Sequence, residues 1–153
     1  ANQSYVESMN SPYDPSGGLP TFRMPTVHAC NGLILSDLPK RFPELRWGFI
    51  ESSCQWVPWI MHETQRRAKQ SGWKIPENPF KEYNIYVSAQ TDDDFNYVFD
   101  YIGDGNVVIG TDYGHTDTSS EVDAIETFRN LEGVSEESKR KVLVDNALAL
   151  YHL

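Results

Sequence analysis

The chain has 153 residues, enough for one domain with a buried core, and its 39% hydrophobic content is that of a globular protein. Thirteen lysines and arginines against 22 aspartates and glutamates give a formal net charge of −9, which argues against nucleic acid and anionic membranes as partners. No stretch approaches the roughly 18 consecutive apolar residues of a membrane span, and the polar N-terminal region has no signal-peptide pattern.

The first 25 residues are predicted to form an irregular loop region. Turn-forming residues crowd between Asn10 and Gly18 and disfavour a helix or a strand there. A helix is predicted from about Thr26 to Leu38, and Pro39 and Pro43 are expected to end it.

From there on, short apolar runs alternate with helical patterns. The predicted strands are residues 45–50, 84–88 and 106–110, and the predicted helices begin at Cys54, Thr91, Ser119 or Ser120, and Ser135. The buried positions are predicted to be Val57, Ile60, Met61, Thr64 and Ala68 in the first of these helices and Val122, Ile125, Phe128 and Leu131 in the third. This order predicts an α/β fold with parallel strands covered by helices. Three strands alone would leave both sheet edges exposed, so the units are expected to belong to a larger closed sheet.

Two carboxylates follow predicted strands, at the edge of a parallel sheet where ligands usually bind. Asp112 comes after the strand at 106–110, and Glu51 ends the strand at 45–50. Together they could share acid–base or metal chemistry. The alternative is that Asp112 caps a loop and that Glu51 is an ordinary acidic residue at a helix start.

Three other side chains are weaker candidates for substrate binding. They are His28 and Trp56, each near a predicted helix start, and His115, which follows Asp112 by three positions. Each has a structural alternative: a histidine in such a place commonly has only a structural role, and a tryptophan commonly packs in the core. Trp59 is expected to anchor the core.

The two cysteines, Cys30 and Cys54, have no metal-binding spacing and suggest no disulfide framework, so a reducing, cytoplasmic setting is predicted. Cys54 lies at a predicted helix start, where a thiol can become a nucleophile. The nearest histidine in sequence is His62, two helical turns on. We therefore interpret both cysteines as small buried side chains.

Four segments form a series with the spacing of a known family. They are Arg41-Phe-Pro-Glu-Leu-Arg46, Phe49-Ile-Glu-Ser-Ser-Cys-Gln-Trp-Val-Pro58, Ile109-Gly-Thr-Asp-Tyr-Gly-His115 and Lys141-Val-Leu-Val-Asp-Asn-Ala-Leu-Ala-Leu-Tyr151. In this order they resemble the amidohydrolase-2 branch of the metal-dependent hydrolases, which includes aminocarboxymuconate-semialdehyde and resorcylate-type decarboxylases. The resemblance covers roughly residues 26–153.

The resemblance implies that residues 26–153 are the C-terminal half of a (β/α)8 barrel, with strands six, seven and eight and their helices. Residues 1–25 would then be the loop region after strand five. A complete barrel takes about 250 residues, so the N-terminal half of the barrel is expected as a partner.

The resemblance also implies roles for individual residues. Asp112 falls on the aspartate that binds or adjoins a divalent metal and shuttles protons; zinc is the first expectation and manganese the alternative. The family's other ligands, a His-x-His pair after strand one and a histidine after strand five, are not in this chain. Glu51 stands where characterised decarboxylases carry a histidine, and Gly114 replaces the usual proline of its turn.

The function implied is that of a metal-dependent hydrolase or a non-oxidative decarboxylase acting on a small carboxylated or cyclic substrate. Two alternatives stay open: a hydratase of ring-cleavage products on the same fold, and a half-barrel that is not catalytic in isolation. The expected partners are the small-molecule substrate and the rest of the barrel, and a homo-oligomer is left open.

Overall fold

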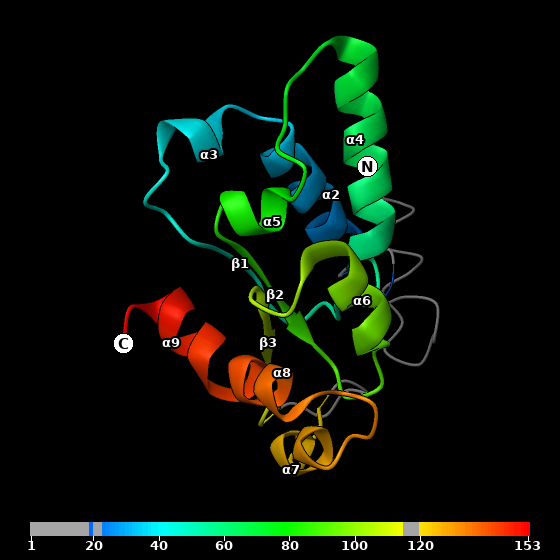
Figure 1. Cartoon of the computed structure of the whole chain (residues 1–153), viewed down its shortest axis with the longest axis vertical. Helices are drawn as coiled ribbons and strands as arrows, with labels where there is room; N and C mark the ends of the chain where they lie inside the picture. Colours follow the sequence, from blue (N-terminus) through cyan, green and yellow to red (C-terminus); the bar gives the residue numbers. More distant parts are fainter. Residues whose placement is uncertain (1–18, 20–22, 115–119) are drawn as a thin grey trace.

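The computed structural model describes residues 19, 23–114 and 120–153. A parallel sheet in the order β1-β2-β3 is formed by Trp47–Phe49, Ile85–Ala89 and Val107–Ile109. The helices are α2 (Met24–Ile34), α3 (Leu38–Arg41), α4 (Val57–Ser71), α5 (Pro79–Glu82), α6 (Phe95–Ile102), α7 (Ala124–Arg129), α8 (Glu136–Arg140), the π-helical turn η2 (Lys141–Asp145) and α9 (Asn146–Tyr151). Figure 1 shows the strands in the middle of the molecule, with α2, α4 and α5 toward one end and α7, α8 and α9 toward the other.

All three strands run parallel, so their carboxyl ends meet at one edge of the sheet. Phe49 of β1 pairs with Val87 of β2, and Val87 pairs in turn with Val107 of β3. The segments that leave the strands at this edge are those predicted from the sequence to carry the site. The three predicted strands are therefore confirmed, each within two residues of its expected bounds.

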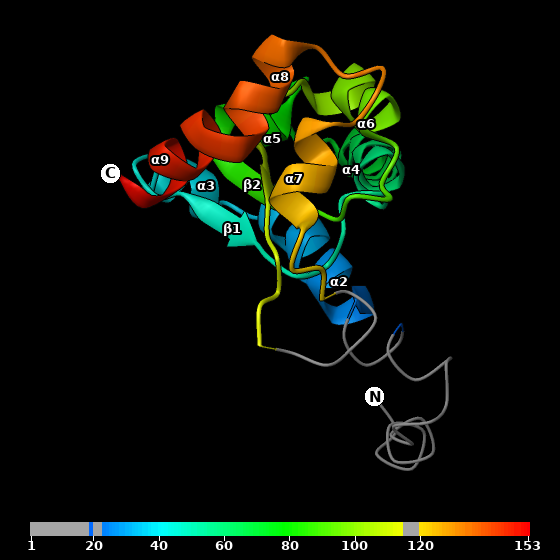
Figure 2. The same cartoon turned by 90° about the horizontal axis from the view of Figure 1, so that it is seen from below.

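The two faces of the sheet are covered differently. Ile85, Val87 and Ala89 belong to the main buried cluster, which also contains side chains of α2, α4, α5 and α6. Because side chains alternate along a strand, Gly48, Tyr86 and Ser88 take the other face. The C-terminal helix α9 reaches that second face, since a Cβ on Gly48 would lie 3.7 Å from Cδ2 of Leu150. Figure 2 shows α9 beside the end of the sheet that β1 forms.

Helix α4 is confirmed by its buried face. The five positions predicted to point inward are all buried: Val57, Ile60, Met61, Thr64 and Ala68. Pro58 lies in the first turn, where the missing N–H has no partner inside the helix in any case. Gly72 ends the helix with a φ of 71°, a left-handed conformation that costs glycine little.

The first helix differs from its prediction. Helix α2 begins at Met24 and ends at Ile34, and the separate turn α3 begins at Leu38. Pro39, which was expected to end a helix, lies in the first turn of α3. A proline fixes a helical φ and removes an N–H that is unpaired there, so at this position it favours a helix start.

Two later helices begin about four residues after their predicted starts. Helix α6 is capped by Asp94, whose Oδ1 accepts from the Tyr97 N–H at 3.1 Å, and not by Thr91. Helix α7 begins at Ala124, and its predicted inward face is wrong in two positions, because Val122 and Ile125 are 66% and 46% exposed. The later start makes Ala124 and Phe128, one helical turn apart, the buried pair.

The C-terminal helix begins as predicted and is tied to β3. Ser135 caps α8, its Oγ accepting from the Ser138 N–H at 3.0 Å. The Asn146 amide donates to the carbonyl oxygens of Asp104 and Val107 at 2.7 and 2.6 Å. The Asn106 oxygen accepts from β2, so the Val107 oxygen points to the opposite edge of β3. Asn146 therefore satisfies one carbonyl on that edge.

A buried carboxylate joins the loops that follow β1 and β2. The side chain of Asp93 accepts from Ser53 Oγ at 2.5 Å, from the Cys54 N–H at 2.9 Å and from the Gln90 N–H at 2.9 Å. The Cys54 thiol also contacts it, at 3.3 Å. Asp93 is only 9% exposed, so these donors replace the water that the carboxylate would otherwise bind.

We expect Asp93→Asn to destabilise the protein by about 1–3 kcal/mol, because the amide nitrogen would face backbone N–H groups and leave a buried donor without an acceptor. Urea unfolding followed by circular dichroism measures the loss. The matched control is Asp92→Asn, which makes the same change at the exposed neighbouring residue. Equal unfolding midpoints for the two variants would contradict the role given to Asp93.

Candidate active site at the carboxyl ends of the strands

A cavity of about 100 Å³ lies at the carboxyl edge of the sheet. Its lining includes Glu51 after β1, Ser88 and Gln90 at the end of β2, and Gly110 and Asp112 after β3. The structure therefore brings together the two carboxylates that the sequence placed at strand ends. Each comes from a different outer strand, with β2 between them.

The backbone at both carboxylates is left-handed, with φ of 62° at Glu51 and 48° at Asp112. Such a conformation is uncommon outside glycine and persists where neighbouring groups hold it. The Glu51 N–H donates to Ser88 Oγ at 2.7 Å, and Ser120 Oγ donates to the Asp112 carbonyl at 3.1 Å. Two serines thus support the backbone from which the two carboxylates extend. Neither serine was predicted as a site residue, and Ser120 was named only as a possible helix start.

A second cavity, of about 460 Å³, adjoins the first, and both are lined by Gln90 and Gly110. Its other lining residues are Arg23, Thr91, Asp92, Ser120 and Glu121. Glu121 is linked to β2 and β3, because its carboxylate accepts from the Thr91 hydroxyl and its N–H donates to the Thr111 carbonyl at 3.0 Å.

Arg23 lies at the start of α2 and reaches across to both strand-end loops. Its Nη2 donates to Gln90 Oε1 at 2.8 Å, and its Nη1 lies 3.5 Å from the Ser52 carbonyl oxygen. Arg23 was not predicted as a site residue, because it falls in a segment predicted to be irregular, with no strand or motif beside it. The one available signal was an arginine just before a helix, and this pattern is too common in proteins to indicate a binding site.

Trp56 does not line either of these cavities. Its ring packs against Phe49 and Phe80, with centroids 6.3 and 6.5 Å apart, and its Nε1 donates to the Ser52 carbonyl at 3.1 Å. The geometry of the described residues therefore gives Trp56 a supporting role for the loop after β1. Substrate contact through this side chain has no support in this arrangement.

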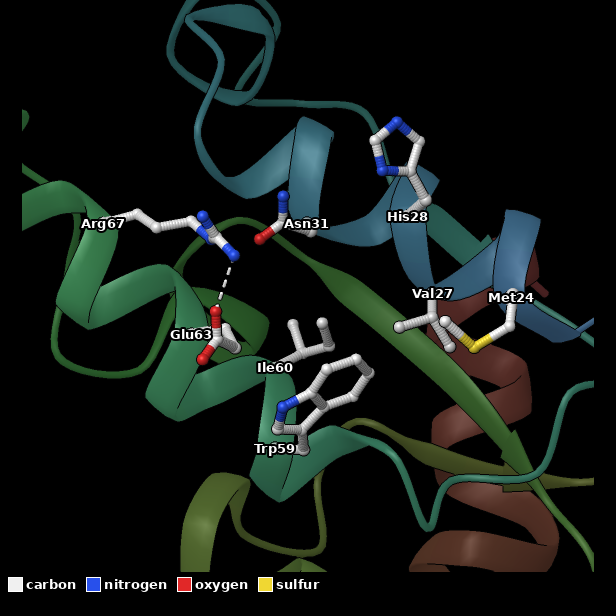
Figure 3. A pocket seen from close by; sticks show the side chains of 8 residues that line it. All are labelled: Met24, Val27, His28, Asn31, Trp59, Ile60, Glu63 and Arg67. Carbon is white, nitrogen blue, oxygen red and sulfur yellow. Dashed lines mark hydrogen bonds and ion pairs between the residues drawn. The ribbon is translucent and has the colours of Figure 1, made fainter. Parts of the chain in front are cut away.

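His28 lies elsewhere, on a groove of about 140 Å³ between α2 and α4 (Figure 3). Trp59, Glu63 and Arg67 line the same groove, and Arg67 Nη2 donates to Glu63 Oε2 at 2.7 Å. Trp59 is 51% exposed, so its expected place in the core is wrong. The side of α4 that carries Trp59, Glu63 and Arg67 faces the groove. His115, the third candidate for substrate binding, lies outside the described residues.

The two cysteines are fully buried, as expected. Burial raises the pKa of the Cys30 thiol well above its ordinary value. Burial also raises the pKa of Cys54, and the charge of Asp93 and its hydrogen bond to the thiol raise it further. Both thiols stay protonated at neutral pH, which is the opposite of what a nucleophilic cysteine requires.

The described residues at this cavity could supply only part of a ligand set for a metal ion. Asp112 and Glu51 offer carboxylate oxygens, which are suitable ligands for a divalent ion. Within the ranges 23–114 and 120–153, no group of three or more His, Cys, Asp or Glu side chains could hold an ion. A complete ligand set therefore needs groups from outside these ranges.

In the same part of the chain, residues 23–114 and 120–153, no helix is long and apolar enough to span a membrane.

Comparison with solved structures identifies the fold. An amidohydrolase (map2389c) of Mycobacterium avium subsp. paratuberculosis K-10 matches with a TM-score of 0.78 and 21% identity over 98% of this chain and 39% of its own. The 5-carboxyvanillate decarboxylase LigW of Sphingomonas paucimobilis matches with 0.69 and 19%, over 99% of this chain and 46% of its own. The IDCase of Metarhizium anisopliae, in apo form, matches with 0.62 and 14%, over 92% and 44%.

The chain thus spans less than half the length of these structures. The predicted fold class, an α/β fold that is part of a (β/α)8 barrel, is confirmed. No curated protein matches the chain. The family model described as "Amidohydrolase" (Amidohydro_2) matches residues 4–153, nearly the whole sequence. The chain therefore belongs to the amidohydrolase family that the sequence motifs indicated.

Proposed function

We propose that the protein carrying this chain is a metal-dependent hydrolase or non-oxidative decarboxylase that acts on a small carboxylated or cyclic molecule. The observation that carries the proposal is the convergence of Glu51 and Asp112 on one cavity at the carboxyl ends of parallel strands. The family supports hydrolase chemistry, and the name of LigW supports including decarboxylation.

In this proposal Asp112 supplies one ligand to a divalent ion, zinc in the first place and manganese as the alternative. A bound ion of this kind polarises a substrate carbonyl or carboxylate and stabilises the negative charge that develops there. The backbone of Asp112 is left-handed and is supported by Ser120, which fixes the position from which the Asp112 side chain extends. The remaining ligands come from parts of the protein outside the described ranges.

Glu51 is proposed to donate or accept the proton of the reaction. It lines the same cavity as Asp112, and Ser88 holds its backbone by the hydrogen bond to the Glu51 N–H. A carboxylate is a common general acid or base, and its exposed position lets it exchange protons with solvent.

The proposed partners are the substrate and the rest of the barrel. Strand β1 pairs only with β2, and β3 pairs only with β2, within the part of the chain that the structure describes. A closed barrel would satisfy the outer edges of both strands. The two buried thiols are consistent with a reducing cytoplasm, which we propose as the location.

We expect Asp112→Asn to lower the divalent-metal content of the full natural protein, because the amide is a weaker ligand that carries no charge. Elemental analysis of the purified proteins measures the difference. Asp100→Asn serves as the control, since it removes an exposed carboxylate on α6 that lines neither strand-end cavity. Equal metal content and equal activity in wild type and Asp112→Asn would refute the role of Asp112.

In the full protein, Glu51→Gln is expected to lower the catalytic rate by roughly 100-fold or more, because it keeps the side chain's shape and removes the group that donates or accepts the proton. Steady-state kinetics on the protein's substrate measures this loss. Glu44→Gln, at an exposed position before β1, is the matched control and should keep the wild-type rate. A loss of less than a few-fold would instead reassign Glu51 to structural support of the loop.

Residues 1–153 expressed alone are expected to self-associate or to be poorly stable, because the outer edges of β1 and β3 offer unpaired backbone groups. Asn146 covers only one carbonyl of the β3 edge by the contact described. Light scattering and a thermal melt provide the measurements. A monomer with one sharp, cooperative transition would show that the segment is self-sufficient and would count against the barrel partner.

A further inference from the structure

Arg23 places a positive charge beside a site whose other charged lining residues are acids. The described residues that line the two strand-end cavities include no other lysine or arginine. The cavity it lines also contains Asp92 and Glu121. In a chain with a net charge of −9, a cation at this position needs a specific explanation.

The described residues hold the guanidinium in place without forming an ion pair with it. Its contacts with described residues are two neutral oxygens, Gln90 Oε1 at 2.8 Å and the Ser52 carbonyl at 3.5 Å. A guanidinium has five N–H donors, so these two contacts leave donors for a ligand. The described residues form no ion pair with Arg23 within 4.0 Å, and Glu121 directs its carboxylate to the Thr91 hydroxyl.

The groups that hold Arg23 are themselves fixed. The Gln90 N–H donates to the buried carboxylate of Asp93, and the Ser52 carbonyl also accepts from Trp56 Nε1. The guanidinium is therefore positioned by the loops that follow β1 and β2. Glu51 lies in the first of these loops and Gln90 begins the second. Such preorganisation lowers the entropy that a ligand must lose on binding.

We propose that Arg23 binds a carboxylate group of the substrate, at a subsite next to the cavity of Glu51 and Asp112. The inference deepens the proposed function and rests on it. The planar fork of a guanidinium matches the two oxygens of a carboxylate. Because both cavities are lined by Gln90 and Gly110, a molecule held at Arg23 can extend to Asp112. Asp92 and Glu121 disfavour a second anionic group beside the first, so the subsite takes a single carboxylate.

The test is a calorimetric titration of the full natural protein with benzoate and with its uncharged analogue benzamide, at constant ionic strength. Benzoate binding should weaken roughly 10- to 100-fold in Arg23→Gln and less in Arg23→Lys, which keeps the charge without the fork. Benzamide binding should be unchanged. The control is Arg41→Gln, which removes one positive charge at an exposed position of α3 that lines neither cavity. This variant should bind benzoate as the wild type does.

Two further measurements separate this subsite from the metal. Metal-stripped wild-type protein should still bind benzoate in an Arg23-dependent way, whereas loss of all benzoate binding on stripping would place the carboxylate at the metal and overturn the proposal. If the protein holds no metal yet benzoate binding depends on Arg23, the subsite stands and the proposed metal-dependent function fails.

A second variant covers the case in which Arg23→Gln does not fold, which a thermal melt detects. Gln90→Glu keeps an acceptor for Arg23 but neutralises it, so benzoate binding should weaken there too. Equal benzoate affinity in wild type, Arg23→Lys and Gln90→Glu, or no preference of the wild type for benzoate over benzamide, would overturn the proposal.

Discussion

A carboxylate that is shut off from water must find donors inside the protein, and Asp93 finds them in two different loops. Ser53 and Cys54 belong to the loop after β1, and Gln90 leaves the end of β2. One side chain therefore holds these two loops together. Glu51 precedes the first loop and Arg23 binds to Gln90, so the geometry of both cavities depends on this buried acid.

In the part of the chain that the structure describes, the site is assembled from three strand ends and one helix start. The strand ends supply two carboxylates, and the start of α2 supplies a guanidinium. Structures with the same fold are more than twice as long, so more than half of such a molecule lies outside the match. The described residues therefore bring two carboxylates and one guanidinium together, and a complete set of metal ligands would need groups from outside these residues.

Sequence patterns were sufficient wherever a short-range signal decided the structure. The apolar runs gave all three strands, the spacing of Ile60, Thr64 and Ala68 gave the buried face of α4, and the motif around Asp112 gave the family. They failed where long-range neighbours decided. Helix α7 starts late, Trp59 faces a groove, and Arg23 acquires its place from loops about 30 and 67 residues away. No local periodicity encodes those contacts.

The left-handed backbone at Asp112 restricts which amino acids that position can accept. Glycine, aspartate and asparagine adopt a φ of 48° at modest cost, because glycine has no Cβ to clash with the following carbonyl and the short polar side chains of aspartate and asparagine can hydrogen-bond locally. Of these three only aspartate carries a charge. Backbone shape and the proposed metal-binding role thus favour the same residue, so exchanging Asp112 would first require remodelling the turn that Ser120 supports.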